Sequence, residues 1–158
     1  MLLTDAEIAR LIDERKPALD AVAFLHAFAR SAPVRGHRRT TRSVVGESGS
    51  RFDVHLRQGV FSPYDFSVIL AYLPPHGTEL ILRRHNGRGH PHRNKLERDT
   101  VDRDAFHIHF ATERYQLAGL SIDGFAEPTT AFSDLATALD AMLVAGGFEP
   151  PPQRSLWP

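Results

Sequence analysis

Histidines are concentrated in two short segments of the chain, at a spacing that suits joint chemistry. Five of the nine histidines lie within the stretches HNGRGHPHRNK, which begins at His85, and HIH. His90 and His92 are two residues apart, and so are His107 and His109. Because side chains two apart in a strand point the same way, each pair is expected on one face. If the two segments pair, four imidazoles converge.

Proton transfer is the first chemistry that these residue types suggest. Imidazole titrates at about pH 6.5, so two histidines on opposite sides of a phosphodiester can remove and return a proton. Cleavage of RNA through its own 2′-hydroxyl also needs a cation on the pentacoordinate phosphorane. We predict His107 and His109 as the acid–base groups and His90 and His92 as assisting groups. The residues predicted to bind substrate are Arg84, Asn86, Asn94, Lys95, Arg114 and Tyr115.

The substrate-binding residues have distinct predicted roles. Arg84, Lys95 and Arg114 supply positive charge for phosphate. Tyr115 can stack on an unpaired base or donate a proton, and the two asparagine amides can orient groups by hydrogen bonds.

Metal binding and a purely structural surface are the alternatives for the same histidines. A metal needs three or four N or O ligands, and nearby acids could complete a set; these are Glu97, Asp99, Asp102, Asp104 and Glu113. The neighbouring arginines and Lys95 would repel a divalent ion, so the sequence favours a site with no metal and no cofactor. The histidines outside the two segments, His26, His37, His55 and His76, are interpreted as ordinary polar residues.

The elements that position these residues can be read from capping and periodicity. A capping box at Thr4 and Glu7 predicts a helix from about Asp5 to Arg15, and the Ala/Leu/Phe-rich run 18–29 predicts a second. Alternation predicts a strand around 52–56, followed by strands at 64–73, 79–84 and 105–110. Helical spacing of apolar residues from Phe132 to Leu143 predicts a last helix, ended by Gly146-Gly147.

These elements predict an α+β fold with N-terminal helices, a central antiparallel sheet and a C-terminal amphipathic helix packed on the sheet. With 158 residues, of which 42% are hydrophobic, one domain over residues 1–148 is expected, followed by a Pro-rich tail at 149–158. The chain has no cysteine, so disulfides and thiolate chemistry are excluded. No signal-peptide pattern or long apolar run is seen, which predicts a cytoplasmic protein without membrane contact.

Charge is distributed unevenly although the formal net charge is zero. Every Lys and Arg except Arg154 lies at or before Arg114, whereas 116–153 carries only acidic charges. The basic half, including Arg35 and Arg42, is therefore the expected surface for an anionic partner. The sequence favours nucleic acid as partner, RNA more than DNA, and an exposed sheet edge also suggests a homodimer.

Five blocks of the chain resemble an uncharacterised family of small bacterial and prophage proteins. The blocks are FSVILAYL, LRRHNG, HPHRNKLE, HIHFATERYQLAG and DGFAEPT with FSDLATAL, between Phe66 and Leu143. The helical beginning, LTDAEIARLID, is also similar. Family members carry similar blocks of the form RYNG, HxHxNK, HIHxATERY and AEPT in the same order; this chain has His85 where they usually have Tyr. A second resemblance is to small RNA-targeting toxins of toxin–antitoxin modules. It implies that Arg84 and the two HxH pairs are the active positions, and that a protein antitoxin is a partner.

The sequence thus yields three functional hypotheses. The first is a metal-independent, toxin-type ribonuclease that uses the histidines for acid–base catalysis. The second is a non-catalytic nucleic-acid-binding or protein-binding module of prophage or defence origin. The third is a metal-dependent hydrolase.

Overall fold

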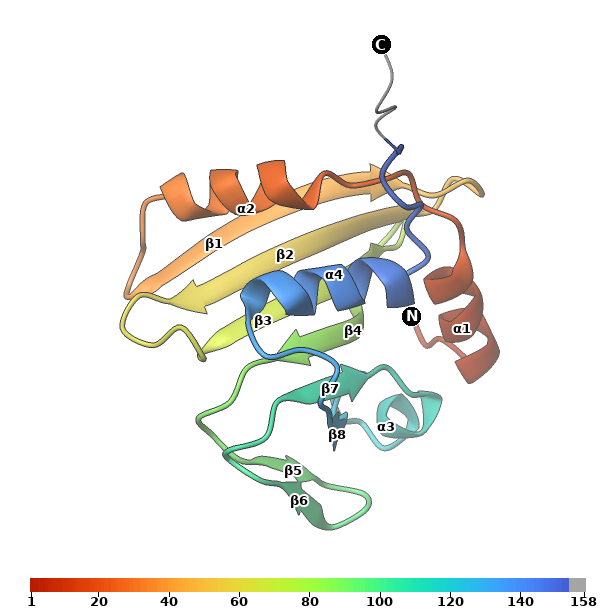
Figure 1. Ribbon diagram of the computed structural model, residues 1–158. Coiled ribbons are helices and arrows are strands. Elements are labelled where there is room, and N and C mark those ends of the chain that lie inside the picture. The colour runs from red at the N-terminus through yellow and green to blue at the C-terminus, as the bar shows by residue number, and fades with distance from the viewer. Residues whose placement is uncertain (154–158) are drawn as a thin grey trace.

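The computed structural model describes residues 1–153 and has an α+β fold in which helices pack on one antiparallel sheet (Figure 1). The last five residues of the predicted Pro-rich tail lie outside the described residues. The helices are α1 (Asp5–Asp13), α2 (Ala21–Arg30), α3 (Glu113–Leu117) and α4 (Leu135–Ala145). The strands are β1 (His37–Val45), β2 (Arg51–Gly59), β3 (Phe66–Leu73), β4 (Leu80–Asn86), β5 (His92–Asn94), β6 (Asp99–Val101), β7 (His107–Phe110) and β8 (Phe125–Pro128).

Six strands form the main sheet in the order β1-β2-β3-β4-β7-β8, with every neighbouring pair antiparallel. Two strands of the described residues, β5 and β6, form a separate hairpin that lies beside β8 (Figure 1). Helix α2 packs over β1 and helix α4 over β3 and β4, on the same face of the sheet (Figure 1). We call the opposite face of β1 to β4 and β7 the open face.

Strand alternation places the core under these helices. Phe52, Val54 and Leu56 of β2 are at most 1% exposed and face α2 and α4 together with Val68 and Leu70 of β3. Burial of such side chains stabilises the fold by roughly 1.5–3 kcal/mol each. Residues between them in β2, such as Asp53 and His55, therefore point to the open face.

The start of α1 and the end of α4 agree with the sequence-based prediction, whereas α4 begins at Leu135 and not at Phe132. The capping box of α1 is present, because Glu7 N donates to Thr4 Oγ1 at 3.2 Å and Thr4 N donates to Glu7 Oε2 at 2.8 Å. Asp134 caps α4 in the same way, and Gly146 ends that helix. Helix α1 is two residues shorter than predicted because the Lys16 side chain takes over its last carbonyls, donating to Leu11 O and Ile12 O.

The sequence-based prediction contains no helix at α3 and no strand at β1, β6 or β8. Strand β1 has the sequence HRRTTRSVV, with charged and hydroxyl residues on both faces, as suits an edge strand that must not aggregate. Strand β8 is short and ends in Pro128. Helix α3 has only five residues and forms because Thr112 caps it, with Tyr115 N donating to Thr112 Oγ1.

None of the helices in residues 1–153 is long and apolar enough to cross a membrane.

Candidate functional site

His107 and His109 lie side by side on the open face of β7. The register pairs His107 with Asn86 and His109 with Arg84 on β4, so these four side chains share that face. The two imidazole rings have centroids 5.1 Å apart. Both side chains are buried, since His107 is 0% exposed and His109 is 3% exposed.

Hydrogen bonds fix the tautomer of both rings. His107 Nδ1 lies 3.2 Å from Ala105 O, and His109 Nδ1 lies 2.8 Å from Asp123 O. A carbonyl only accepts, so Nδ1 carries the proton in each ring and Nε2 keeps its lone pair. Both Nε2 atoms face the amide nitrogen of Asn86, at 3.5 Å from His107 and 3.3 Å from His109.

Burial makes both imidazoles weak bases. Desolvation lowers the pKa of His107 to about 4. Desolvation, followed by the nearby Arg84 guanidinium, lowers the pKa of His109 to about 3. Both rings are therefore neutral near pH 7, which suits a proton acceptor or a metal ligand and does not suit a proton donor.

His92 joins the pair from the β5–β6 hairpin. Its ring centroid lies 4.4 Å from that of His109 and 6.1 Å from that of His107. His92 Nε2 donates to Gly124 O at 2.8 Å, which leaves Nδ1 available for a second contact. His90, on the exposed loop before β5, reaches to 5.9 Å from the ring of His107. We call His90, His92, His107 and His109 the histidine cluster.

The four imidazoles therefore converge, but the two segments do not pair. Strand β5 pairs only with β6 among the described residues, and β7 pairs with β4 and β8. The fifth histidine, His85, points to the opposite face. There its Nδ1 donates to Ala138 O of α4 at 3.1 Å and its ring stacks on Phe132 at 4.9 Å. His85 thus links sheet to helix and takes no part in the cluster.

Asn94 places the hairpin against the sheet. Its amide nitrogen donates to Ala126 O at 2.9 Å, and its oxygen accepts from Ala126 N at 2.8 Å. The side chain thus pairs with the free backbone N–H and carbonyl of Ala126 at the edge of β8, as a neighbouring strand would. It is only 3% exposed. Asn94 was predicted to bind substrate. Since its amide is fully used in this contact and in one to Asp99, it has a positioning role instead.

A cavity of about 310 Å³ opens beside the cluster and is rich in cations. Its walls include His90, His92 and His109, with Arg84, Arg93 and Lys95 as the positive side chains. Arg84 Nη2 pairs with Asp123 Oδ2 at 2.5 Å, and Asp123 is only 2% exposed, so these two charges compensate each other. Neither Arg93 nor Lys95 has an acidic partner among the described residues. The cavity therefore attracts an anion.

A second hollow of about 560 Å³ shares Arg84, Asn86 and His90 with this cavity and extends along the open face. It adds Arg57 and Arg88 to the lining. Arg57 pairs with Asp65 at 3.1 Å, and Arg88 lies over the ring of Tyr64 at 4.2 Å. Four arginines, Arg57, Arg84, Arg88 and Arg93, therefore line one or both of the two hollows.

Two predicted substrate-binding residues lie in a different setting from the one expected. Tyr115 is 1% exposed and its hydroxyl donates to Glu97 Oε2 at 2.6 Å, so its ring has no free face on which a base could stack. Burial raises the pKa of Tyr115, with the bond to Glu97 adding to the effect. Arg114 is ion-paired with Glu97 and lies over the Phe125 ring, and it does not line the cavity.

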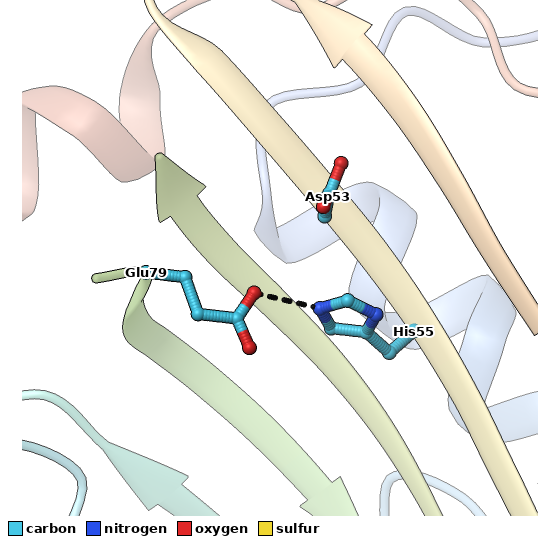
Figure 2. Close-up of side chains that lie close together, drawn as sticks. All are labelled: Asp53, His55 and Glu79. Atoms are coloured by element: carbon cyan, nitrogen blue, oxygen red, sulfur yellow. Dashed lines mark hydrogen bonds and ion pairs between the residues drawn. The ribbon is translucent and has the colours of Figure 1, made fainter. Parts of the chain in front are cut away.

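The acids proposed from the sequence to complete a metal site are not grouped with the cluster. Within residues 1–153 one set of three histidine or carboxylate ligand atoms lies within 4.8 Å, and it consists of Asp53, His55 and Glu79 (Figure 2). His55 was interpreted as an ordinary polar residue. No local signal pointed to this set, because Glu79 is 24 residues from His55.

The chain was compared with protein-family models, curated proteins and solved structures. No family model, curated protein or solved structure matched it.

Proposed function

We propose that the protein is a metal-independent, toxin-type ribonuclease that cleaves RNA at the histidine cluster. The observation that carries this proposal is the neutral His109, which lines a cavity with two uncompensated cations, Arg93 and Lys95, and whose Nε2 lone pair faces the Asn86 amide that substrate would displace. Cleavage through the RNA 2′-hydroxyl requires a neutral base that can take a proton and cations that neutralise the phosphorane, and this cavity is lined by both kinds of group.

In the proposed reaction His109 Nε2 takes the proton of the 2′-hydroxyl, and the 2′-oxygen attacks the phosphorus. The bond from phosphorus to the 5′-oxygen breaks, and the leaving oxygen takes a proton from the protonated ring of His92. The products are a 2′,3′-cyclic phosphate and a 5′-hydroxyl, so protons and electron pairs balance. Lys95 and Arg93 neutralise the charge that develops on the phosphorane.

The roles assigned here differ between the four histidines for physical reasons. His107 is fully buried and does not line the cavity, so it positions Asn86 and His109 rather than reaching substrate. His109 has a low pKa in the empty site, and the negative charge of a bound phosphodiester raises it toward the working range. His92 is less buried than His109 and closest to it, which makes it the proton donor.

A metal-dependent hydrolase is the second candidate function, and one observation favours it. His92, His107 and His109 each place one ring nitrogen on a backbone carbonyl, which is how proteins orient histidine ligands of metals. In that case His107 and His109 would bind through Nε2 and His92 through Nδ1, and the rings would have to move closer together, because these three nitrogens do not form a set within 4.8 Å of one another in the structure. The amide of Asn86 faces the same two Nε2 atoms, and a metal would have to displace it.

The deciding experiment is cleavage of a labelled mixed RNA pool by untagged protein, in EDTA and then with added Zn²⁺ or Mn²⁺. We expect cleavage in EDTA that is lost in His109→Gln and retained in His26→Ala, an exposed histidine on α2. Cleavage only with metal would replace the first candidate by the second. If neither condition gives cleavage while binding of RNA weakens steeply with salt, the protein is a nucleic-acid-binding module and the ribonuclease proposal is wrong.

A further inference from the structure

A second group of potential ligands lies on the open face, away from the histidine cluster. Asp53 and His55 are two apart on β2 and point the same way, and Glu79 reaches them from the residue before β4 (Figure 2). One ligand atom from each lies within 4.8 Å of those of the other two. The closest contact is His55 Nε2 to Glu79 Oε2, at 2.9 Å.

The residue between the two strands explains how Glu79 can reach β2. Strand β3 lies between β2 and β4, and the β3 residue paired with Asp53 is Ala71, which also pairs with Ile81 of β4. Its methyl side chain fills little of the space above the sheet. The carboxylate of Glu79 can therefore cross the strand and meet the imidazole, where a larger side chain at 71 would block it.

Hydroxyl groups on the neighbouring strand orient the other two ligands. Thr41 Oγ1 lies 2.7 Å from His55 Nδ1, and Ser43 Oγ donates to Asp53 Oδ1 at 2.5 Å. Thr41 and Ser43 stand directly opposite His55 and Asp53 in the β1–β2 register. Because the Thr41 hydroxyl can accept a hydrogen bond from Nδ1–H, the neutral ring can carry its proton on Nδ1 and offer the lone pair of Nε2 to a metal.

The charge of the group also calls for a cation. Two carboxylates share this small area, and within residues 1–153 neither forms an ion pair with a lysine or arginine. Glu79 contacts the His55 imidazole at 2.9 Å, and an exposed contact of this kind contributes little to stability. A divalent ion would neutralise both carboxylates at once.

We propose that Asp53, His55 and Glu79 form a binding site for a divalent transition metal, with Zn²⁺ as the best-suited ion. One imidazole nitrogen and two carboxylate oxygens are a donor set that zinc accepts, with water completing its coordination. The partly exposed Glu79 side chain supplies the small movement that brings the three atoms to bonding distance. This site is separate from the histidine cluster and does not depend on the ribonuclease proposal.

The test is an isothermal calorimetric titration with ZnCl₂ of untagged protein that has been treated with EDTA and dialysed. The His107→Ala/His109→Ala protein is used as background so that the cluster cannot contribute its two buried ligands. We expect one Zn²⁺ per chain, weakened about tenfold or more by His55→Ala and by Glu79→Gln, since loss of a ligand costs at least as much as loss of its orienting partner.

The matched control is His76→Ala, because His76 is an exposed histidine three residues from Glu79 and outside the ligand set. It should bind Zn²⁺ as the background protein does, and Mg²⁺ should not compete at equal concentration. Equal affinity in the background and the His55→Ala proteins, or no binding in the background protein, would overturn the proposal. Far-ultraviolet circular dichroism of each variant shows whether it is folded, so that loss of Zn²⁺ binding can be distinguished from unfolding.

Discussion

The side-chain amide nitrogen of Asn86 on β4 lies 3.3 Å from Nε2 of His109 on β7. Both side chains are buried, although they lie on the face of the sheet that α2 and α4 leave uncovered. The amide cannot turn round freely, because Ser67 Oγ donates to its oxygen at 2.8 Å. The nitrogen is thus directed at His109 and, at 3.5 Å, at His107. A donor in this place stabilises the neutral form of both rings.

The Asn86→Asp substitution should favour the protonated form of His107 and His109 over the neutral form. A carboxylate accepts hydrogen bonds and carries negative charge, so the protonated form of His107 and His109 becomes favoured and their pKa values should rise by about 1 to 3 units. Proton and nitrogen NMR of the imidazole resonances over a pH series measures this directly. Titration curves that do not move would show that Asn86 does not control the state of these rings.

Acid should destabilise the protein well above the pH at which its carboxylates titrate. Burial lowers the pKa of His85 to about 4, of His107 to about 4 and of His109 to about 3. In the unfolded chain histidine has a pKa of about 6.5, so between that value and about 4 the unfolded state binds more protons. The stabilisation is therefore complete above about pH 6.5 and is lost as pH falls.

Urea unfolding at pH 7 and pH 5 tests this sign. The free energy of unfolding should drop by on the order of 2 kcal/mol for each of the three histidines that stays neutral. In the His107→Gln/His109→Gln protein the drop should shrink to the part due to His85. Equal stability of the native protein at both pH values would contradict the burial of neutral imidazoles.

Asn94→Ala should destabilise the protein through the hairpin that carries His92. Loss of the Asn94 amide leaves the buried N–H and carbonyl of Ala126 without partners, which should lower the free energy of unfolding by about 3 kcal/mol. Hydrogen exchange should accelerate over β5 and β6 before it does so in β2 and β3. Thr100→Ala, an exposed change on the same hairpin, is the control and should leave both stability and exchange nearly unchanged.

Removal of the two uncompensated cations should weaken RNA binding in a salt-dependent way. For Lys95→Gln/Arg93→Gln we expect the slope of log affinity against log salt concentration to fall by about 0.7 for each charge removed. Fluorescence anisotropy with a labelled single-stranded RNA at several salt concentrations gives the slope. Arg10→Gln, which removes an exposed charge from α1, should not change it; an unchanged slope in the double variant would mean that RNA does not enter this cavity.

The sequence by itself determined the local features of this protein. Thr4 with Glu7 defines the start of α1, alternation around Val54 defines β2, and the HxH spacing places His107 and His109 on one face of β7. These features depend on contacts between residues a few positions apart, which capping and periodicity describe. Together they predict the α+β fold. Of the candidate site residues, Arg84, Lys95, His90, His92 and His109 line the cavity, whereas Arg114 and His107 do not, and Arg93 was not among the candidates.

Only the tertiary structure decided the protonation state of those histidines and which residues contact them. The neutral state of His109 comes from burial beneath the hairpin and from partners at Asn86, Arg84 and Asp123. Likewise Glu79 meets His55 because Ala71 leaves space between their strands. Desolvation and strand register arise from residues far apart in the chain, and a pattern of neighbouring residues contains no information about them.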